Sequence, residues 1–293
     1  MIAIPPRPAS SGDDVRVALS TVIRTAYGSL AASALHEDVA AFCSVRDRAR
    51  SKGGAKTEVE AVAAEEALVL YGAVLAQTQN HLGVEVREQK VDFDLVTERM
   101  AALFNLASSY SLRGSLPAMA DADAIKTAAR HFQLAAGALE AAQELVKDAE
   151  PDARRPSDLA EDAIAPVRTL MLAQAQACFC EKAALDKLGA ATQRKLCAGA
   201  AQLYQQAADA FTPLAKNHKP LHDWGAAVAA GRGKYYDACA RWQAAEEALA
   251  AQQYGVRQSQ LQLCCAALQQ AQAALGCARR PCQRRAHRAH RPC

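Results

Sequence analysis

Residues 170–183 read LMLAQAQACFCEKA, a helix-like run whose only charges are a Glu and a Lys near its end. Its apolar side chains form two adjacent helical stripes, one of Leu172, Ala175 and Phe179 and one of Met171, Ala175 and Cys178. This apolar sector is wider than a single buried helix face needs. Such a helix is buried on two sides, or is buried on one side and exposed as an interaction patch on the other. The residues of this run leave both interpretations open.

The helical pattern continues on either side of this run. Hydrophobic residues make up 51% of the chain, but aromatic residues make up only 5%. Ala accounts for much of the hydrophobic content, and Ala is the best helix former. After a first helix that stops near Gly28, the pattern predicts helices over residues 33–50, 56–82, 96–114, 121–149, 158–188, 191–211, 221–251 and 255–276. Gly53 and Gly54 separate two of them.

Residues 83–95, GVEVREQKVDFDL, are the one stretch in which apolar and polar residues alternate. A period of two is typical of a β-strand. We therefore expect a small β element near residues 83–95 in an otherwise helical chain.

Small residues recur where helices are expected to touch, as in HFQLAAGALEAA and LCAGAAQLYQQAADAF. Alternation of Ala and Gly with periodic large residues is typical of stacked helical hairpins. The predicted fold class is mainly all-α, an elongated tetratricopeptide-like helical solenoid.

The sequence lacks the patterns of several other protein classes. It contains no run of 18 apolar residues, no secretory signal pattern, no GxSxG, no Gly-rich phosphate loop and no HExxH. The ten Cys lack metal-ligand spacing, and Cys178 and Cys180 point about 200° apart on a helix. We therefore expect buried or half-buried free thiols in a reduced, cytoplasmic setting, no metal, no cofactor and no enzyme activity.

Basic charge is concentrated at the end of the chain. The net charge is +3, but residues 279–293 hold six Arg and no acid, which leaves the remainder mildly acidic. We expect a helical domain over residues 1–276 and a disordered Arg-rich tail over residues 277–293. Such a tail suits weak contact with an anionic membrane or another anionic partner, while no specific nucleic-acid recognition is expected.

Several stretches, taken in order, resemble the BRO-one domain found in Alix and in fungal Bro- and PalA-type adaptors. The chain opens with IAIPPRPASSGDDVRVALSTVIRTAYG and continues with ALFNLASSYS and AARHFQLAAGALEAAQE. The most specific match is DLAEDAIAPVRTLMLAQAQACFCEKA, followed by QLYQQAADAF and YGVRQSQL. The resemblance covers about residues 1–275.

The resemblance implies a non-enzymatic cytoplasmic adaptor, recruited to endosomes, that binds the C-terminal amphipathic helix of an ESCRT-III subunit. The family's apolar trough, carried over from the MLAQAQ block, falls on Phe179, Thr192 and Leu196. Lys182 or Arg194 is near enough to meet acids on the partner. Thr192 stands where the family has a large aliphatic residue, which is expected to weaken binding. The alternative is a helical-repeat scaffold for another partner, including an adaptor in ambient-pH signalling.

Two departures from the family accompany this resemblance. The segment over residues 83–100 looks shorter than the family's strand-containing connection, and the chain stops before the family's later helices. Those helices supply the other wall of the trough in the family, so their absence is expected to expose apolar surface.

Overall fold

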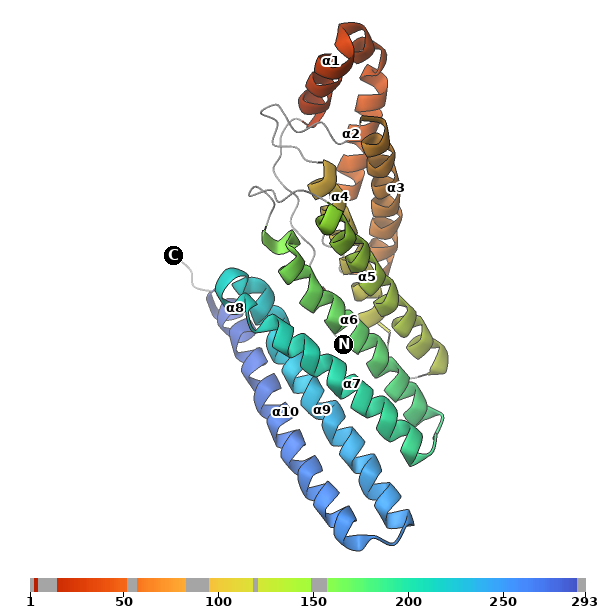
Figure 1. Ribbon diagram of the computed structural model, residues 1–293, viewed down its shortest axis with the longest axis vertical. Helices are drawn as coiled ribbons and strands as arrows, with labels where there is room; N and C mark the ends of the chain where they lie inside the picture. Colours follow the sequence, from red (N-terminus) through yellow and green to blue (C-terminus); the bar gives the residue numbers. More distant parts are fainter. Residues whose placement is uncertain are drawn as a thin grey trace. The chain divides into compact units, whose positions relative to one another are not determined.

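The computed structural model describes residues 3–4, 15–51, 57–82, 95–117, 121–148 and 157–288. Every regular element in these residues is helical (Figure 1), which confirms the predicted all-α class. No helix in these ranges is both long enough and apolar enough to cross a membrane. The chain divides into two compact units, described separately below.

The first unit comprises residues 117–136 and 160–293, together with Met1. It contains most of α5 (Ala122–Asp148), up to Ala136, and α6 (Glu161–Leu185), α7 (Ala190–Phe211), α8 (Leu214–Asn217), α9 (Lys219–Ala250) and α10 (Tyr254–Arg288). Helices α6 and α7 form one antiparallel hairpin, α9 and α10 form another, and α7 packs along α9 (Figure 1). Stacked hairpins of this kind confirm the expected helical-repeat packing within this unit.

The two hairpins turn in the same way. Helix α6 ends with Lys187 at φ 52°, and Leu188 N–H donates to Ala183 O while Lys187 N–H donates to Ala184 O. Helix α9 ends with Gln252 at φ 58°, and Gln253 and Gln252 repeat this pair of bonds. Each turn is a Schellman motif, which satisfies carbonyls at the helix end and reverses the chain within a few residues.

The second unit comprises residues 2–116 and 137–159. It contains α1 (Val15–Ala34), α2 (His36–Ser51), α3 (Glu58–Leu82), α4 (Leu95–Ser115), the end of α5 and a short 3-10 helix, η1 (Ser157–Leu159). Helix α3 starts at a capping box, in which Thr57 and Glu60 each accept the other's backbone N–H. In the first unit, the Asp121 carboxylate caps the first turn of α5 by accepting two N–H groups.

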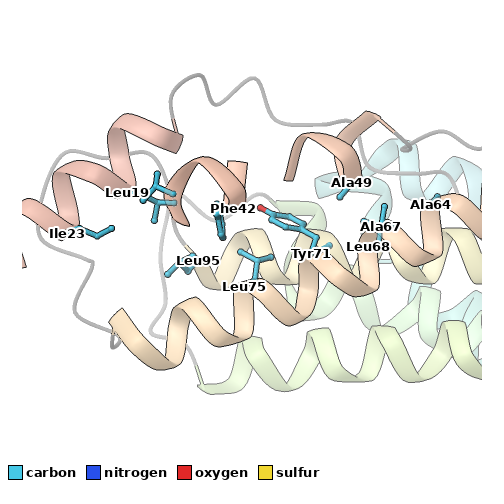
Figure 2. Close-up of a cluster of buried hydrophobic side chains, with 12 residues drawn as sticks. Leu19, Ile23, Phe42, Ala49, Ala64, Ala67, Leu68, Tyr71, Leu75 and Leu95 are labelled. Carbon is cyan, nitrogen blue, oxygen red and sulfur yellow. The ribbon is translucent and has the colours of Figure 1, made fainter. Parts of the chain in front are cut away.

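The core of the second unit lies between α1, α2, α3 and α4 (Figure 2). Phe42 and Tyr71 meet edge to face, with ring centroids 5.9 Å apart. Within this core Glu98 accepts hydrogen bonds from Tyr71 Oη at 2.8 Å and from Arg46 Nε at 2.9 Å. The buried guanidinium of Arg46 is thereby neutralised, as a buried charge requires.

Some predicted boundaries differ from the structure. Gly28 was expected to end the first helix, and it does break the helical geometry (φ 88°, ψ 170°), but helix resumes to Ala34. The expected β element near residues 83–95 lies outside the described residues up to position 94, and Leu95 begins α4. The last helix was expected over residues 255–276, whereas α10 runs from Tyr254 to Arg288, because most residues beyond position 276 are good helix formers such as Ala, Gln and Arg.

Candidate partner-binding surface on α6 and α7

Helix α6 is mostly a core element. Its first turn carries Glu161 and Asp162, which suit the positive end of the helix dipole, and its last turn carries Lys182. Thirteen of its residues are buried, among them Met171, Ala175 and Cys178 of the stretch 170–183. Phe179 is the exception, because 41% of its side chain is exposed. The core interpretation therefore holds for most of α6, and the interface interpretation concerns the edge that carries Phe179.

The structure brings Phe179, Thr192 and Leu196 onto two adjacent antiparallel helices. Gln176, one turn before Phe179, donates from Nε2 to the backbone carbonyl of Leu196 on α7 at 3.3 Å. Leu196 is half-buried at this junction, and Thr192, one turn earlier on α7, is exposed. We call Phe179, Thr192, Leu196 and Lys182 the α6–α7 surface.

The two cations near this surface have partners within the chain. Lys182 Nζ bonds Asp186 Oδ2 at 2.5 Å, within the same helix and at a partly exposed site. Lys182 therefore stays on the α6 side of the surface. Arg194, considered from the sequence as a second cation for an acidic partner, pairs instead with Glu247 on α9 at 2.8 Å. Arg194 thus faces α9.

Buried thiols lie behind the α6–α7 surface. Burial raises the pKa of Cys178 to about 12, and a hydrogen bond with Cys180 is the main cause that raises the pKa of Cys197 to about 12. Cys178 and Cys180 are both buried, and Cys180 lies close enough to Cys197 on α7 to affect its pKa. Six of the seven described cysteines are buried or half-buried free thiols, and Cys265 is exposed.

The residues at this surface have the chemistry of an apolar contact. In the part of the chain that the structure describes, no three His, Cys, Asp or Glu side chains are grouped to hold a metal ion. Sequence reasoning missed Gln176, whose amide joins the two helices. Its only signal was a polar residue one turn before Phe179 in an apolar run.

Comparison with known proteins gives consistent relatives. The family model of the BRO1-like domain matches residues 1–290. The chain is 34% identical over 185 residues to the pH-response regulator protein palA/RIM20 of Pyricularia oryzae, covering 62% of this chain and 21% of that protein. It is 33% identical over 122 residues to the ALG-2 interacting protein X of Dictyostelium discoideum, covering 42% of this chain and 15% of that protein.

Solved structures show the same fold. A structure titled as an ALIX BRO1 CHMP4C complex has a TM-score of 0.71 at 21% identity, covering 96% of this chain and 87% of that chain. A structure of ALIX with a viral late-domain peptide has a TM-score of 0.71 at 22% identity, covering 93% of this chain and 41% of that chain. With the family match spanning nearly the whole sequence, the chain belongs to the BRO1-like domain family.

Proposed function

We propose that this chain is an adaptor whose α6–α7 surface binds an amphipathic helix, of the kind found at the C-terminus of ESCRT-III subunits. The observation that carries the proposal is an exposed Phe179 on α6 and a half-buried Leu196 on α7, on two helices that the Gln176–Leu196 hydrogen bond joins. An aromatic side chain left exposed beside an aliphatic one offers anchor positions for a helix with apolar residues at i and i+3 or i+4.

The relatives support an adaptor role. Their names include pH-response regulators and vacuolar protein-sorting proteins, and the likeness to a structure titled as a CHMP4C complex supports a helical partner. The chain spans only 21% and 15% of two of these relatives, so the activity of those longer proteins at endosomes is part of the proposal here. Neither a catalytic step nor a cofactor is part of the proposed function.

The test is calorimetric titration of the full chain with a peptide carrying that amphipathic helix. Phe179→Asp is expected to lower affinity at least tenfold, because placing a carboxylate in the contact removes an aromatic anchor worth about 1.5–3 kcal/mol. Leu268→Asp is the matched control, since Leu268 on α10 has a similar exposed fraction of 43% but lies on a different helix. Circular dichroism checks that both variants fold. Unchanged affinity in a folded Phe179→Asp variant would refute the assignment of the surface.

A second candidate is an adaptor in an ambient-pH response. It is favoured by 34% and 33% identity to the regulators of Pyricularia oryzae and Yarrowia lipolytica, which cover 62% and 63% of this chain. A chimera in which this chain replaces the matching part of the Yarrowia regulator tests it. Restored growth across the pH range would support this role, and a chimera that is expressed but inactive would oppose it.

We propose that the Arg-rich segment from Arg279 onward binds weakly to anionic lipids. This contact would assist recruitment to a membrane surface. Binding of the full chain to vesicles with and without anionic lipid, at low and high salt, checks this proposal. Equal binding to neutral and anionic vesicles would contradict it.

A further inference from the structure

Three thiols lie on three helices of the first unit that pack in turn, α6 on α7 and α7 on α9. They are Cys180 on α6, Cys197 on α7 and Cys239 on α9. Cys197 lies close enough to both of the others for each of them to shift its pKa, and Tyr235 likewise acts on the pKa of Cys239. Cys197 is therefore the central member of the group.

Hydrogen bonds between other residues fix the same register for α7 and α9. Gln243 Nε2 on α9 donates to Gln193 Oε1 on α7 at 3.1 Å. Cys197 lies one turn after Gln193, and Cys239 lies one turn before Gln243. Since the two helices run antiparallel, the Gln pair places Cys197 opposite Cys239.

The junction of α6 with α7 places the third thiol beside them. Gln176 on α6 donates to the carbonyl of Leu196 on α7 at 3.3 Å. Cys180 lies one turn after Gln176, and Cys197 directly follows Leu196. Both thiols therefore lie within about one helical turn of this hydrogen bond, and Cys180 is close enough to raise the pKa of Cys197.

The three thiols differ in access to solvent. Cys180 and Cys197 are 5% and 7% exposed, whereas Cys239 is half-buried. A small solute therefore meets Cys239 first, and a product formed there has Cys197 as its neighbour. All three are free thiols in this structure.

We propose that hydrogen peroxide converts Cys239 and Cys197 into a disulfide that links α9 to α7. The sulfur of Cys239 attacks one peroxide oxygen, the O–O bond breaks, and Cys239 sulfenic acid and one water form. The sulfur of Cys197 then attacks the sulfenic sulfur, the S–O bond breaks, and a second water leaves. Two thiols lose two electrons in total and one peroxide is reduced to two waters.

The resting protein stays reduced under mild conditions. The neighbouring Cys197 and burial raise the pKa of Cys239, and the pKa of Cys197 is raised to about 12, so the thiolate fraction of both at neutral pH is small and oxidation is slow. Sustained peroxide or alkaline pH is needed for the bond to form. The disulfide is therefore expected to form after prolonged exposure to peroxide and not after a brief pulse.

The cross-link also lies next to the α6–α7 surface. Cys197 follows Leu196 and Cys180 follows Phe179 in sequence, so fixing α7 against α9 is expected to change the fit of a partner helix. This consequence rests on the proposed function, whereas formation of the disulfide does not.

The test treats the full chain with hydrogen peroxide at mildly alkaline pH, blocks the remaining thiols and maps disulfide-linked peptides by mass spectrometry. A linked pair containing Cys197 and Cys239 is expected, together with a rise in Tm on the order of 5–10 °C that dithiothreitol reverses. Cys239→Ser and Cys197→Ser should each abolish this pair. Cys180→Ser and the exposed-site control Cys265→Ser should both retain it.

Two results would overturn the proposal. One is a folded protein in which Cys197 and Cys239 stay reduced while Cys265 oxidises. The other is a Cys180–Cys197 link in place of the expected one. Peptide titration of the reduced and oxidised protein separates this proposal from the proposed function, because reduced protein that fails to bind refutes the docking surface and leaves the disulfide map unaffected.

Discussion

Gln176 on α6 and Leu196 on α7 are joined by a side-chain-to-backbone hydrogen bond of 3.3 Å. This bond sets the position of Phe179, one turn along α6, relative to Leu196. A polar residue in an apolar helix thus aligns the two hydrophobic residues of the proposed docking surface.

Replacing this amide is expected to weaken both the helix junction and partner binding. Gln176→Ala should lower the free energy of unfolding by about 0.5–1.5 kcal/mol, the usual contribution of one hydrogen bond. Urea denaturation followed by circular dichroism measures this change, and Gln269→Ala on the exposed face of α10 is the control. Equal stability of the two variants would mean that the Gln176 bond contributes nothing to the junction.

Thr192 is expected to limit the affinity of the proposed α6–α7 surface. Thr192→Ile should tighten binding of the amphipathic peptide about tenfold, because it adds apolar contact worth roughly 1–2 kcal/mol. Both residues are β-branched, so helix propensity changes little. Thr192→Ser should shift affinity in the opposite direction. Titration calorimetry compares the three proteins, and weaker binding by Thr192→Ile would place position 192 outside the contact.

The turn between α6 and α7 is strained at Lys187, a non-glycine residue with φ 52°. Lys187→Gly should raise the free energy of unfolding by about 1 kcal/mol, because only glycine adopts this conformation without steric cost. The corresponding rise in Tm is about 2–4 °C. Lys195→Gly, at an exposed position inside α7, should instead lower stability by about 1 kcal/mol. Thermal melts that moved both variants in the same direction would contradict the assigned turn.

Buried thiols make the fold sensitive to alkali. Burial raises the pKa of Cys178 from 9.0 to about 12, despite the nearby Arg232, while the neighbouring Glu181 raises it further. Above pH 9 the unfolded chain releases this proton and the folded chain keeps it, so the free energy of unfolding falls as pH rises from about 9 to about 12. Cys178→Ala should flatten this fall, whereas the exposed Cys265→Ala should not. Urea denaturation at a series of pH values measures both slopes.

Gly225 on α9 has no room for a side chain. A Cβ at this position would overlap the ring of Phe211, which is fully buried and meets Trp224 edge to face at 6.1 Å. Gly225→Ala should therefore cost about 1–3 kcal/mol through overpacking. Gly255→Ala in α10 has open space and should gain about 0.5–1 kcal/mol. A stable Gly225→Ala variant with an unchanged melting curve would show that the α7–α9 contact can relax.

The helical class was predictable from local sequence patterns, which favour helix whatever tertiary contacts the segment makes. The Ala-rich composition and the 3.6-residue period placed α5 and α6 within a few residues of their observed bounds. The last helix was predicted to end at residue 276, whereas α10 continues to Arg288. For the residues after position 276, the clustered charge suggested a tail, whereas the helix propensity of Arg, a good helix former, favoured a helix, and the structure is helical up to Arg288.

Only the part of the candidate surface that lies on a single helix was predictable, because the spacing of residues along one helix follows from the sequence. Phe179 and Lys182 share one helix, so their proximity follows from the helical repeat. The approach of Cys180 to Cys197 and Cys239 depends on the register between three helices, which no spacing within one helix reveals. Arg194 was placed with the partner-facing residues for the same reason, because Glu247 lies more than fifty residues away in sequence.

The beginning of the chain cannot adopt its final structure early. Ile4 is buried, its N–H donates to Ser111 Oγ at 2.7 Å, and its carbonyl accepts from Ser108 Oγ at 2.7 Å. Both serines belong to α4, 107 and 104 residues further along the chain. During synthesis on the ribosome, the segment around Ile4 must therefore wait until α4 has emerged before it can reach its native contacts.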